Sequence, residues 1–393
     1  MKVAFVRGPF LNPWELQSYV PVAAKHPFSA IGAHWQFYTQ PITLPNISIE
    51  KTGVWGETLG KRNPSAAIFY NRALSWTLGR SYGLLNLKKA VGDADILHAA
   101  ELHSTMTYQC LRLKRKQRTA LVLTVWENLL HTGELHPLRH LRKRAVMREA
   151  DGFLAVTETS ARMLREEGVS PDRIAVIPMS VDLQRFVPAP KDPKLAIQLG
   201  ILPDDYVVLF IGRFVPEKGI LDLLECIPSL NRGREAMRLR FLFVGAGPLQ
   251  PVLEQAQDRY PELIRVHPFV PYEDISALHN LADVFVLPSR PTPKWQEQFG
   301  YVLIESMASG KPVVTTRTGS IPDVAGDAAL LVEPGQPKAL GEGLAAVIDG
   351  KEKLSFLSHK ALARAQQLFS AERNAPLIES FYQSALAHSR RRR

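Results

Sequence analysis

Short apolar runs alternate with longer stretches of helical periodicity along the whole of this 393-residue chain. In the first half, the apolar runs predict strands at 2–7, 33–39, 95–98, 120–125, 152–156 and 173–177. Between them, helical periodicity predicts helices near 67–90, 104–117, 137–150 and 158–168. Such alternation favours βαβ units and a mainly parallel sheet that helices cover on both faces. The chain is therefore expected to be an α/β protein.

A proline-rich break at 188–193 divides the chain, and the alternation restarts after it. Strands are predicted at 206–212, 239–244, 263–266, 283–287, 312–316 and 329–332, and helices near 216–229, 248–259, 272–281, 300–309, 336–349, 353–368 and 371–388. A chain of this length is long for one hydrophobic core. Two similar-sized domains are therefore expected, with a ligand cleft between them at the carboxyl ends of strands.

The net charge of +10 is concentrated in three basic segments, at 112–118, 139–148 and 390–393. Such segments suit anionic lipid, nucleic acid or an anionic substrate, and solvated helix faces are the plain alternative. No aromatic-interleaved basic stretch supports a nucleic-acid-binding protein. A helix at 136–148 would place Leu138, Leu141 and Ala145 on one face with arginines and Lys143 around it. Peripheral contact with an anionic membrane is therefore a hypothesis.

Two cysteines, Cys110 and Cys226, lie far apart in the sequence. They provide neither a disulfide framework nor a cysteine-based zinc site, and they suit a reducing cytoplasm. The apolar run that opens the chain breaks at Arg7, too early for a secretory signal, and no apolar stretch is long enough for a transmembrane helix. A cytoplasmic protein is expected, with a peripheral place on the inner membrane face as an open alternative.

Two carboxylates, Glu297 and Glu305, flank the start of a predicted helix that runs from about Gly300 to Ser309. A helix amino end offers backbone N–H groups and positive dipole to an anion. Carboxylates beside such an end would suit a sugar attached to a phosphate. Two solvated glutamates on a surface helix are the alternative.

A strand end, a glycine and two cations occur together at 206–219, where Arg213 and Lys218 flank a turn. Arginine can hold a diphosphate through two parallel hydrogen bonds, and lysine adds a mobile point charge. The segment is therefore a candidate diphosphate site, unless both side chains are merely solvated.

Other motifs favour no second chemistry. Gly245-Ala246-Gly247-Pro248 has Gln250 where a dinucleotide loop needs its third glycine, and Lys311 is followed by proline, so Walker A is absent. Asp93-Ala94-Asp95 is interpreted as a turn before a strand, with metal binding as the weaker alternative. His98, Glu101 and His103 fit no structural zinc spacing. Trp126-Glu127-Asn128 follows the strand at 120–125 and could hold a sugar or an acceptor.

The ordered set of motifs resembles family 4 glycosyltransferases, which are retaining, nucleotide-sugar-dependent enzymes of GT-B fold. The set comprises Gly212-Arg213-Phe214, Glu217-Lys218-Gly219, Val244 to Pro248, Ala282 to Ser289, Glu297 with Glu305, and Ala308 to Val314. The resemblance is dense in the second half and looser in the first, where Ile177 to Phe186 matches the segment before the linker. It implies two Rossmann-like domains that face each other across a cleft, with 1–186 on the acceptor side and 187–370 binding the donor. The last helix, 371–393, would cross back onto the first domain.

The resemblance also implies residue roles. Arg213 and Lys218 would hold the donor diphosphate, Glu305 the ribose hydroxyls, and Glu297 the transferred sugar. Backbone N–H groups of Phe299, Gly300, Tyr301 and Val302 would cap the sugar and phosphate. Catalysis would rest on Glu297, Arg213 and Lys218, with no metal and no further cofactor, through front-face substitution in which the leaving diphosphate helps to deprotonate the acceptor.

Two departures from the family pattern fall on the acceptor side. The loop after the first strand lacks the usual run of glycines, and Trp126-Glu127-Asn128 stands where many members have a histidine. Glu15, Trp126 and Glu127 are therefore candidate acceptor-side residues, and the acceptor is unidentified. A GT-B-like sugar phosphorylase or epimerase is the alternative enzyme, and a non-catalytic nucleic-acid-binding protein is the weaker third hypothesis.

Overall fold

The chain folds into two compact units in the computed structural model, which describes residues 1–38, 40–132, 134, 136–234 and 237–392. Unit 1 comprises Met1–Ser180 and Ala371–Arg393, and unit 2 comprises Val181–Ser370. The sequence placed the division after residue 186. It falls earlier because Val181 N donates a hydrogen bond to Phe369 O (2.8 Å), which ties the segment after Ser180 to unit 2.

Unit 1 is built on a seven-stranded sheet in the order β3-β2-β1-β4-β5-β6-β7, and every described strand pair in it is parallel. The strands are β1 (Val3–Gly8), β2 (Phe28–Ala33), β3 (Ile47–Thr52), β4 (Ile96–Ala100), β5 (Ala120–Val125), β6 (Gly152–Ala155) and β7 (Ile174–Val176). The helices are α1 (Pro13–Leu16), α2 (Val20–Ala23), α3 (Glu57–Arg62), α4 (Pro64–Leu78), α5 (Leu87–Val91), α6 (Thr105–Lys114), α7 (Pro137–Glu149), α8 (Glu158–Glu166) and α17 (Ala371–Arg391), with short 3-10 turns η1 (Gln17–Tyr19) and η2 (Pro171–Arg173).

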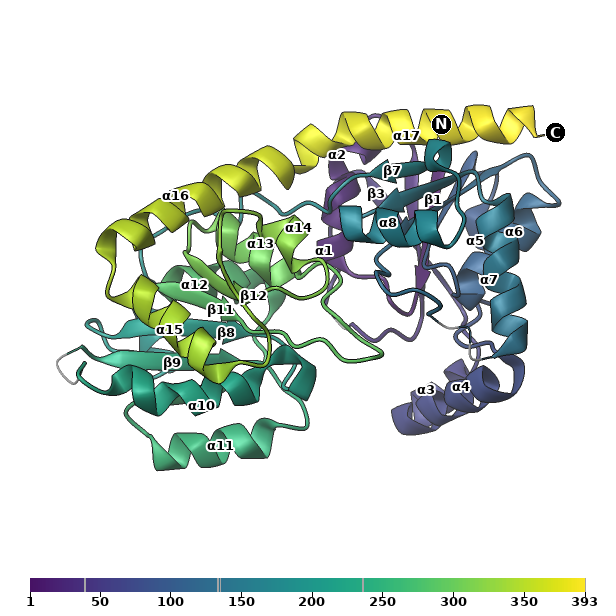
Figure 1. Cartoon of the computed structure of the whole chain (residues 1–393). Coiled ribbons are helices and arrows are strands. Elements are labelled where there is room, and N and C mark those ends of the chain that lie inside the picture. The colour runs from purple at the N-terminus through teal and green to yellow at the C-terminus, as the bar shows by residue number, and fades with distance from the viewer. Residues whose placement is uncertain (39, 133, 135, 235–236, 393) are drawn as a thin grey trace. The chain divides into compact units, whose positions relative to one another are not determined.

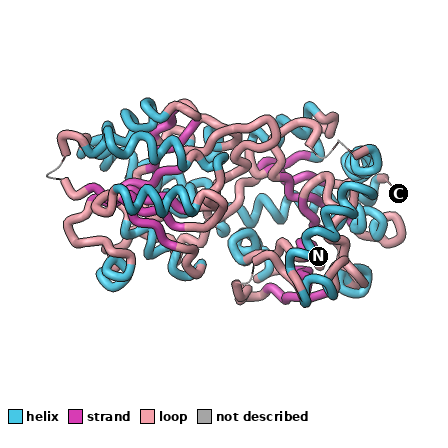
Figure 2. Tube along the Cα trace, turned by 90° about the horizontal axis from the view of Figure 1, so that it is seen from below, coloured by secondary structure: helices cyan, strands magenta, loops and turns pink. Residues whose placement is uncertain are grey.

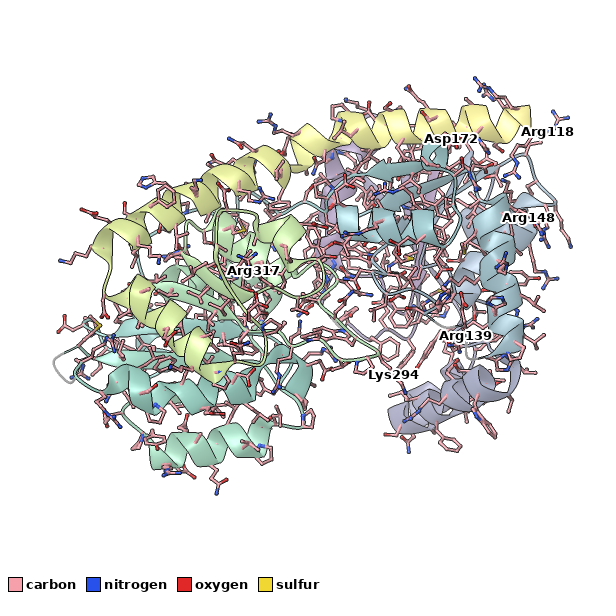
Figure 3. All side chains as sticks on the ribbon, viewed as in Figure 1. Arg118, Arg139, Arg148, Asp172, Lys294 and Arg317 are labelled. Carbon is pink, nitrogen blue, oxygen red and sulfur yellow. The ribbon has the colours of Figure 1, made fainter. Side chains whose placement is uncertain are left out.

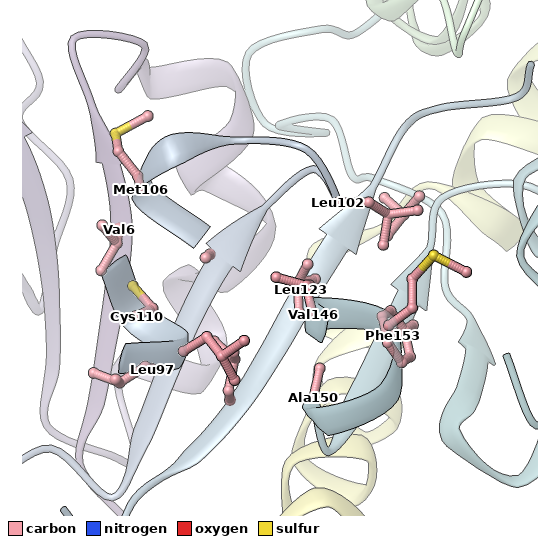
Figure 4. Close-up of a cluster of buried hydrophobic side chains, with 14 of the residues drawn as sticks. Val6, Leu97, Leu102, Met106, Cys110, Leu123, Val146, Ala150 and Phe153 are labelled. Atoms are coloured by element: carbon pink, nitrogen blue, oxygen red, sulfur yellow. The ribbon is translucent and has the colours of Figure 1, made fainter. Parts of the chain in front are cut away.

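The core of unit 1 lies between this sheet and helices that cover it. Leu97 and Leu123 of the central strands belong to one cluster with Met106 and Cys110 of α6 and Val146 of α7, which Figure 4 shows. Apolar side chains of α8 complete the cluster. Strands buried on both faces consist of near-continuous apolar residues, which is why the sequence located β4, β5 and β6 well.

Two sequence predictions in unit 1 were wrong. The strand predicted at 33–39 is β2, which ends at Ala33, and β3 was not predicted because its alternating polar residues form an exposed edge. The single helix predicted at 67–90 is two helices, because Gly79 adopts a left-handed conformation (φ +58°) that ends α4.

Helix α17 covers one face of the sheet of unit 1 and is anchored by polar contacts (Figure 1). The Tyr382 hydroxyl hydrogen-bonds to His98 Nδ1 (2.7 Å), and His98 Nε2 hydrogen-bonds to Thr124 Oγ1 (2.8 Å). Asn374 Nδ2 donates to Pro178 O (3.1 Å). His98 therefore lies inside β4 as a buried structural residue.

Unit 2 repeats the architecture with a six-stranded parallel sheet in the order β10-β9-β8-β11-β12-β13. The strands are β8 (Tyr206–Ile211), β9 (Leu239–Val244), β10 (Ile264–His267), β11 (Val284–Leu287), β12 (Val313–Thr316) and β13 (Leu330–Val332). The helices are α9 (Pro193–Gln198), α10 (Ile220–Asn231), α11 (Gln250–Arg259), α12 (Ile275–Leu281), α13 (Tyr301–Ala308), α14 (Ile321–Ala325), α15 (Pro337–Ile348) and α16 (Lys351–Leu368), with 3-10 turns η3 (Pro216–Lys218) and η4 (Tyr272–Asp274).

Both sheets have the doubly wound order of a Rossmann-like fold, so the predicted α/β class is confirmed. Figure 2 shows strands inside and helices outside in each unit. The strand order reverses between β1 and β4 in unit 1 and between β8 and β11 in unit 2, and such switch points are where ligands bind in open α/β sheets. Among the helices of the described residues, none has the length and apolar character needed to cross a membrane.

Candidate active site

A buried ion pair lies at the switch point of unit 2. Lys218 Nζ is 2.6 Å from Glu297 Oε2, and the Ser289 hydroxyl donates to the same oxygen (2.8 Å). Lys218 ends η3 after β8, and Ser289 and Glu297 lie in the loop after β11. Lys218 Nζ also lies 5.1 Å from the centre of the Trp295 ring. Two residues that the sequence predicted as catalytic are thus in contact, although the sequence separates them by 79 positions.

The loops after β8 and β11 approach each other so closely that only glycine fits at the contact. A Cβ atom on Gly219, which adopts φ +69°, would lie only 1.8 Å from Pro288 O. Arg290 N donates to Glu217 O (2.8 Å), and Ser320 N donates to Glu297 O (2.8 Å). Glycine at position 219 is therefore required for η3 to approach the end of β11 and for Lys218 to reach Glu297.

Arg213 stands apart from this pair. Its side chain is 57% exposed, and its ion-pair partner among the described residues is Glu217, at 3.8 Å. Arg213 follows β8 directly, at the same sheet edge as Lys218. It therefore presents a solvent-accessible guanidinium at the switch point, which is free to rearrange around an incoming anion.

Glu305 is buried within α13 and not on an open surface. The Tyr272 hydroxyl donates to its Oε1 (3.1 Å), and its Oε2 lies 3.8 Å from His279 Nε2. Burial holds the pKa of His279 below its usual value in spite of the nearby carboxylate. The alternative interpretation, in which Glu297 and Glu305 are solvated surface residues, is therefore wrong, because each carboxylate is buried and accepts a hydrogen bond from a protein hydroxyl.

The start of α13 separates the two carboxylates. Gly300 adopts a left-handed conformation (φ +78°) just before Tyr301, the first residue of the helix. Phe299 is buried, and Tyr301 and Val302 are half-buried. The helix spans 301–308, within one residue of the prediction at each end, so its positive amino end lies in the loop that carries Glu297.

The predicted acceptor-side residues lie together at the carboxyl edge of the sheet of unit 1. Glu15 is buried and accepts hydrogen bonds from Arg7 Nε (2.7 Å) and Asn12 Nδ2 (3.3 Å). Burial raises the pKa of the Glu15 carboxyl even with Arg7 beside it. The Trp126 side chain lies close to the Glu15 carboxyl, so residues of the segments that follow β1 and β5 meet.

Glu101 belongs to the same group, although it was not among the predicted acceptor-side residues. Its Oε1 accepts a hydrogen bond from Trp126 N (3.2 Å), and its backbone has φ +64°, which is rare for a residue other than glycine. Burial, followed by the charge of Glu127, raises the pKa of Glu101 to about 8. Glu127 Oε2 in turn lies 3.8 Å from His103 Nδ1. Glu101 could have been recognised in the sequence as a candidate site residue, because it directly follows a buried strand that borders the switch point.

A pocket of about 330 Å³ opens beside this group within unit 1. Its lining includes the cationic side chains Arg7 and Arg139, the imidazole of His103 and the carboxyl group of Glu101. Burial and nearby cations lower the pKa of His103 to about 4, so its ring is neutral near pH 7. The pocket thus combines two guanidinium groups with groups that can hydrogen-bond to hydroxyls.

Lysine side chains accompany the acidic groups that could hold a metal. Asp93 pairs with Lys2 Nζ, and Asp95 accepts a hydrogen bond from Lys2 N (2.7 Å), as a turn before β4 requires. His131, Glu134 and Glu167 lie within ligand distance of one another, but Lys143 Nζ bridges both carboxylates at 2.8 and 2.6 Å. In both places a protein cation is already the partner of the acidic groups.

The chain matches known protein families in both of its units. Residues 205–349 match the family model described as "Glycosyl transferases group 1", and residues 49–185 match "Glycosyltransferase Family 4". D-inositol 3-phosphate glycosyltransferase 1 of Catenulispora acidiphila is 30% identical over 325 residues, which cover 77% of this chain and 75% of that protein. D-inositol 3-phosphate glycosyltransferase of Nocardia farcinica is 31% identical over 254 residues, which cover 62% of this chain and 55% of that protein. The matched segments thus span from about half to three quarters of the relatives' own lengths.

Solved structures share the arrangement of elements. The sucrose-phosphate synthase of Thermosynechococcus elongatus has a TM-score of 0.71 at 18% identity, covering 98% of this chain and 99% of that chain. Anabaena Alr3699/HepE in complex with UDP-glucose has a TM-score of 0.70 at 19% identity, covering 98% and 100%. Two Rossmann-like units with these neighbours define the GT-B fold. The chain belongs to glycosyltransferase family 4, as its sequence motifs predicted.

Proposed function

We propose that this protein is a retaining glycosyltransferase that moves a sugar from a nucleotide-diphosphate sugar to a hydroxyl acceptor, with the nucleoside diphosphate as leaving group. The observation that carries the proposal is the buried Lys218–Glu297 pair at the switch point of unit 2. A carboxylate held there can accept hydrogen bonds from sugar hydroxyls, and the ammonium group can contact the adjacent phosphate.

Each predicted donor residue has a role in this proposal. Lys218 and Arg213 neutralise the negative charge that develops on the leaving diphosphate, and Glu297 orients the transferred sugar. Glu305 accepts hydrogen bonds from the ribose, and the backbone N–H groups from Phe299 to Val302 lie around the phosphate and sugar. Because protein cations supply the positive charge, we propose a reaction without a metal or another cofactor.

The acceptor is proposed to be a phosphorylated polyol. In unit 1, Arg7 and Arg139 line the pocket beside Glu101, and Glu15, Trp126 and Glu127 lie in the same group. Guanidinium groups suit a phosphate, and carboxylates suit polyol hydroxyls. Two relatives are named D-inositol 3-phosphate glycosyltransferases, so a phosphorylated cyclitol is the first compound to test. We place the reaction in the cytoplasm, where nucleotide sugars and reduced cysteines occur together.

A two-stage experiment tests the proposal. First, nucleoside diphosphates and their sugars are screened for an increase in melting temperature, since a ligand of the native state stabilises it. UDP-glucose comes first because the Anabaena neighbour was solved with it. Then the stabilising donor is incubated with inositol 3-phosphate and other polyol phosphates, and release of nucleoside diphosphate is measured.

Transfer with the donor's anomeric configuration retained, as determined by NMR of the product, is the expected result. Inversion would overturn the retaining mechanism, and no donor binding at all would overturn the donor site. Conversion of the sugar to its 1-phosphate by inorganic phosphate would instead indicate the alternative phosphorylase, and a changed sugar on an intact nucleotide would indicate the epimerase.

A further inference from the structure

Helix α4 of unit 1 buries a polar residue and exposes large aromatic residues, the reverse of what is usual for a surface helix. Its inward face carries a buried asparagine, Asn71, which donates to Trp55 O (3.1 Å) and accepts from Tyr82 N (2.7 Å). Its outward face carries Phe69 and Trp76, whose side chains are 74% and 84% exposed. These aromatic residues are two helical turns apart, so they lie on the same face. Large apolar side chains gathered on an exposed face indicate an interaction surface.

The exposed apolar surface continues at the start of α7. Arg142 donates to Gly79 O (2.9 Å) and Leu78 O (3.0 Å), so α7 caps the carboxyl end of α4. Figure 1 shows α4 at the end of α7, and Figure 3 labels Arg139 near this junction. Leu138 and Leu141 of α7 are 43% and 62% exposed. We call Phe69, Trp76, Leu138 and Leu141 the apolar patch.

The helices around the apolar patch are basic. Helices α4, α6 and α7 together contain a single acidic residue, Glu149, and it already pairs with Arg115 and Arg148. Arg72 lies between Phe69 and Trp76 on α4, and Arg72, Arg144 and Arg148 are all exposed. A surface of exposed aromatic and aliphatic residues flanked by arginines has the chemistry of helices that lie in the interface of an anionic bilayer.

This surface differs from the one that the sequence suggested. Of the cations expected around the 136–148 helix, Arg139 and Arg142 bind α4, and Lys143 is buried between Glu134 and Glu167. These three cations contact protein groups and do not face a membrane, so α7 alone makes a weak membrane helix. The exposed aromatic residues of α4, Phe69 and Trp76, supply the missing apolar surface.

We propose that the apolar patch, with Arg72 and Arg144 beside it, docks unit 1 onto an anionic phospholipid bilayer. Trp76 and Phe69 enter the headgroup region, and the arginines contact lipid phosphates. Trp and Phe side chains gain free energy when they leave water, and each basic residue near a negatively charged surface adds to the attraction. The proposal stands independently of the glycosyl transfer proposed above, because it involves none of the donor or acceptor residues.

Vesicle binding by the full chain tests the proposal. Binding to vesicles of phosphatidylglycerol and phosphatidylcholine is measured by flotation and compared with vesicles of phosphatidylcholine alone. The variant Phe69→Ser with Trp76→Ser is expected to bind the anionic vesicles about a hundredfold more weakly, since each aromatic contributes about a tenfold factor. Arg72→Glu is expected to weaken binding about tenfold, and wild-type binding should fall as salt rises.

The matched control replaces two equally exposed apolar residues of unit 2, Ile197→Ser with Phe356→Ser, whose side chains are 77% and 56% exposed. This variant is expected to bind vesicles as the wild type does. Quenching of tryptophan fluorescence by brominated lipids should be smaller in Trp76→Phe, which places residue 76 at the membrane. Circular dichroism confirms that each variant is folded.

Three results would overturn the proposal. The first is equal vesicle binding by the aromatic variant and the wild type. The second is binding to phosphatidylcholine as strong as to the anionic vesicles. The third is a dimer in light scattering that the Phe69→Ser, Trp76→Ser variant dissociates, because the apolar patch would then serve a second copy of the chain.

Discussion

Lys218 Nζ lies 2.6 Å from Glu297 Oε2, and only 13% and 8% of the two side chains are exposed. The pair joins the ends of two neighbouring strands, β8 and β11, which are consecutive in the sheet but not in the sequence. A diphosphate bound near Lys218 would compete with Glu297 for the ammonium group, and sugar hydroxyls would donate hydrogen bonds to the carboxylate. Binding of a nucleotide sugar would thus exchange one internal contact for two external ones.

The first prediction concerns this ion pair. Lys218→Ala should remove about 2–4 kcal/mol of transition-state stabilisation, which would be measured as a lower kcat/KM. It should also lower the free energy of unfolding by about 3 kcal/mol, because Glu297 stays buried without its cation. Adding Glu297→Gln removes that charge, so the double variant should regain stability but not activity. Calorimetric melting and nucleoside diphosphate release measure the two effects separately. A double variant no more stable than Lys218→Ala would contradict this account.

The second prediction separates a binding role of Glu305 from a structural one. Glu305→Gln should weaken nucleoside diphosphate binding about tenfold or more, since a hydrogen bond to a charged acceptor contributes about 1.5–3 kcal/mol. Glutamine can still accept the hydrogen bond from Tyr272, so the melting temperature should change little. Tyr272→Phe is the control, because it removes that internal hydrogen bond and keeps the carboxylate. Equal loss of affinity in titration calorimetry of both variants would assign Glu305 a merely structural role.

The third prediction tests the contact that brings Lys218 into place. Gly219→Ala would put a methyl group 1.8 Å from Pro288 O, so the two loops must separate. Gly168, which follows α8, also has a positive φ (+91°), but a Cβ atom there meets nothing within 4 Å. Gly168→Ala should therefore cost only the backbone strain, about 1–2 kcal/mol, and Gly219→Ala about 3 kcal/mol or more. Equal changes in melting temperature for the two variants would show that the contact yields without cost.

The fourth prediction follows from the buried imidazole of unit 1. Burial lowers the pKa of His98 from its usual value near 6.5 to about 3. Between pH 6.5 and pH 3, His98 is protonated in the unfolded chain but stays neutral in the native state. The free energy of unfolding therefore falls as the pH drops through this range. His98→Gln should abolish this part of the dependence, about 2 kcal/mol between pH 7 and pH 4.5.

Calorimetric melting between pH 4.5 and pH 7 measures the effect of His98. At pH 7 the variant itself should be less stable by about 1–3 kcal/mol, because the hydrogen bonds to Tyr382 and Thr124 are perturbed. An unchanged slope of melting temperature against pH in His98→Gln would show that other groups govern acid unfolding.

Much of the fold could be predicted from local pattern. Buried parallel strands such as β5 and β9 are continuous apolar runs, so their positions follow directly from the sequence. The exposed strand β3 and the break at Gly79 could not be located in this way, because an edge strand carries polar residues and one glycine among many marks no helix end by itself. Motif order was also enough to indicate the family.

The sequence by itself determined the α/β class, the two sheets and the residue types that we propose to meet a sugar and a diphosphate, because periodicity and motif spacing are local properties. Only the tertiary structure decided which of those residues touch. It paired Lys218 with Glu297, buried Glu305 beside Tyr272, brought Glu101 into the group around Glu15, and turned the aromatic face of α4 outward. These relationships depend on strand order and on close backbone contacts such as that of Gly219 with Pro288, which join segments far apart in the chain.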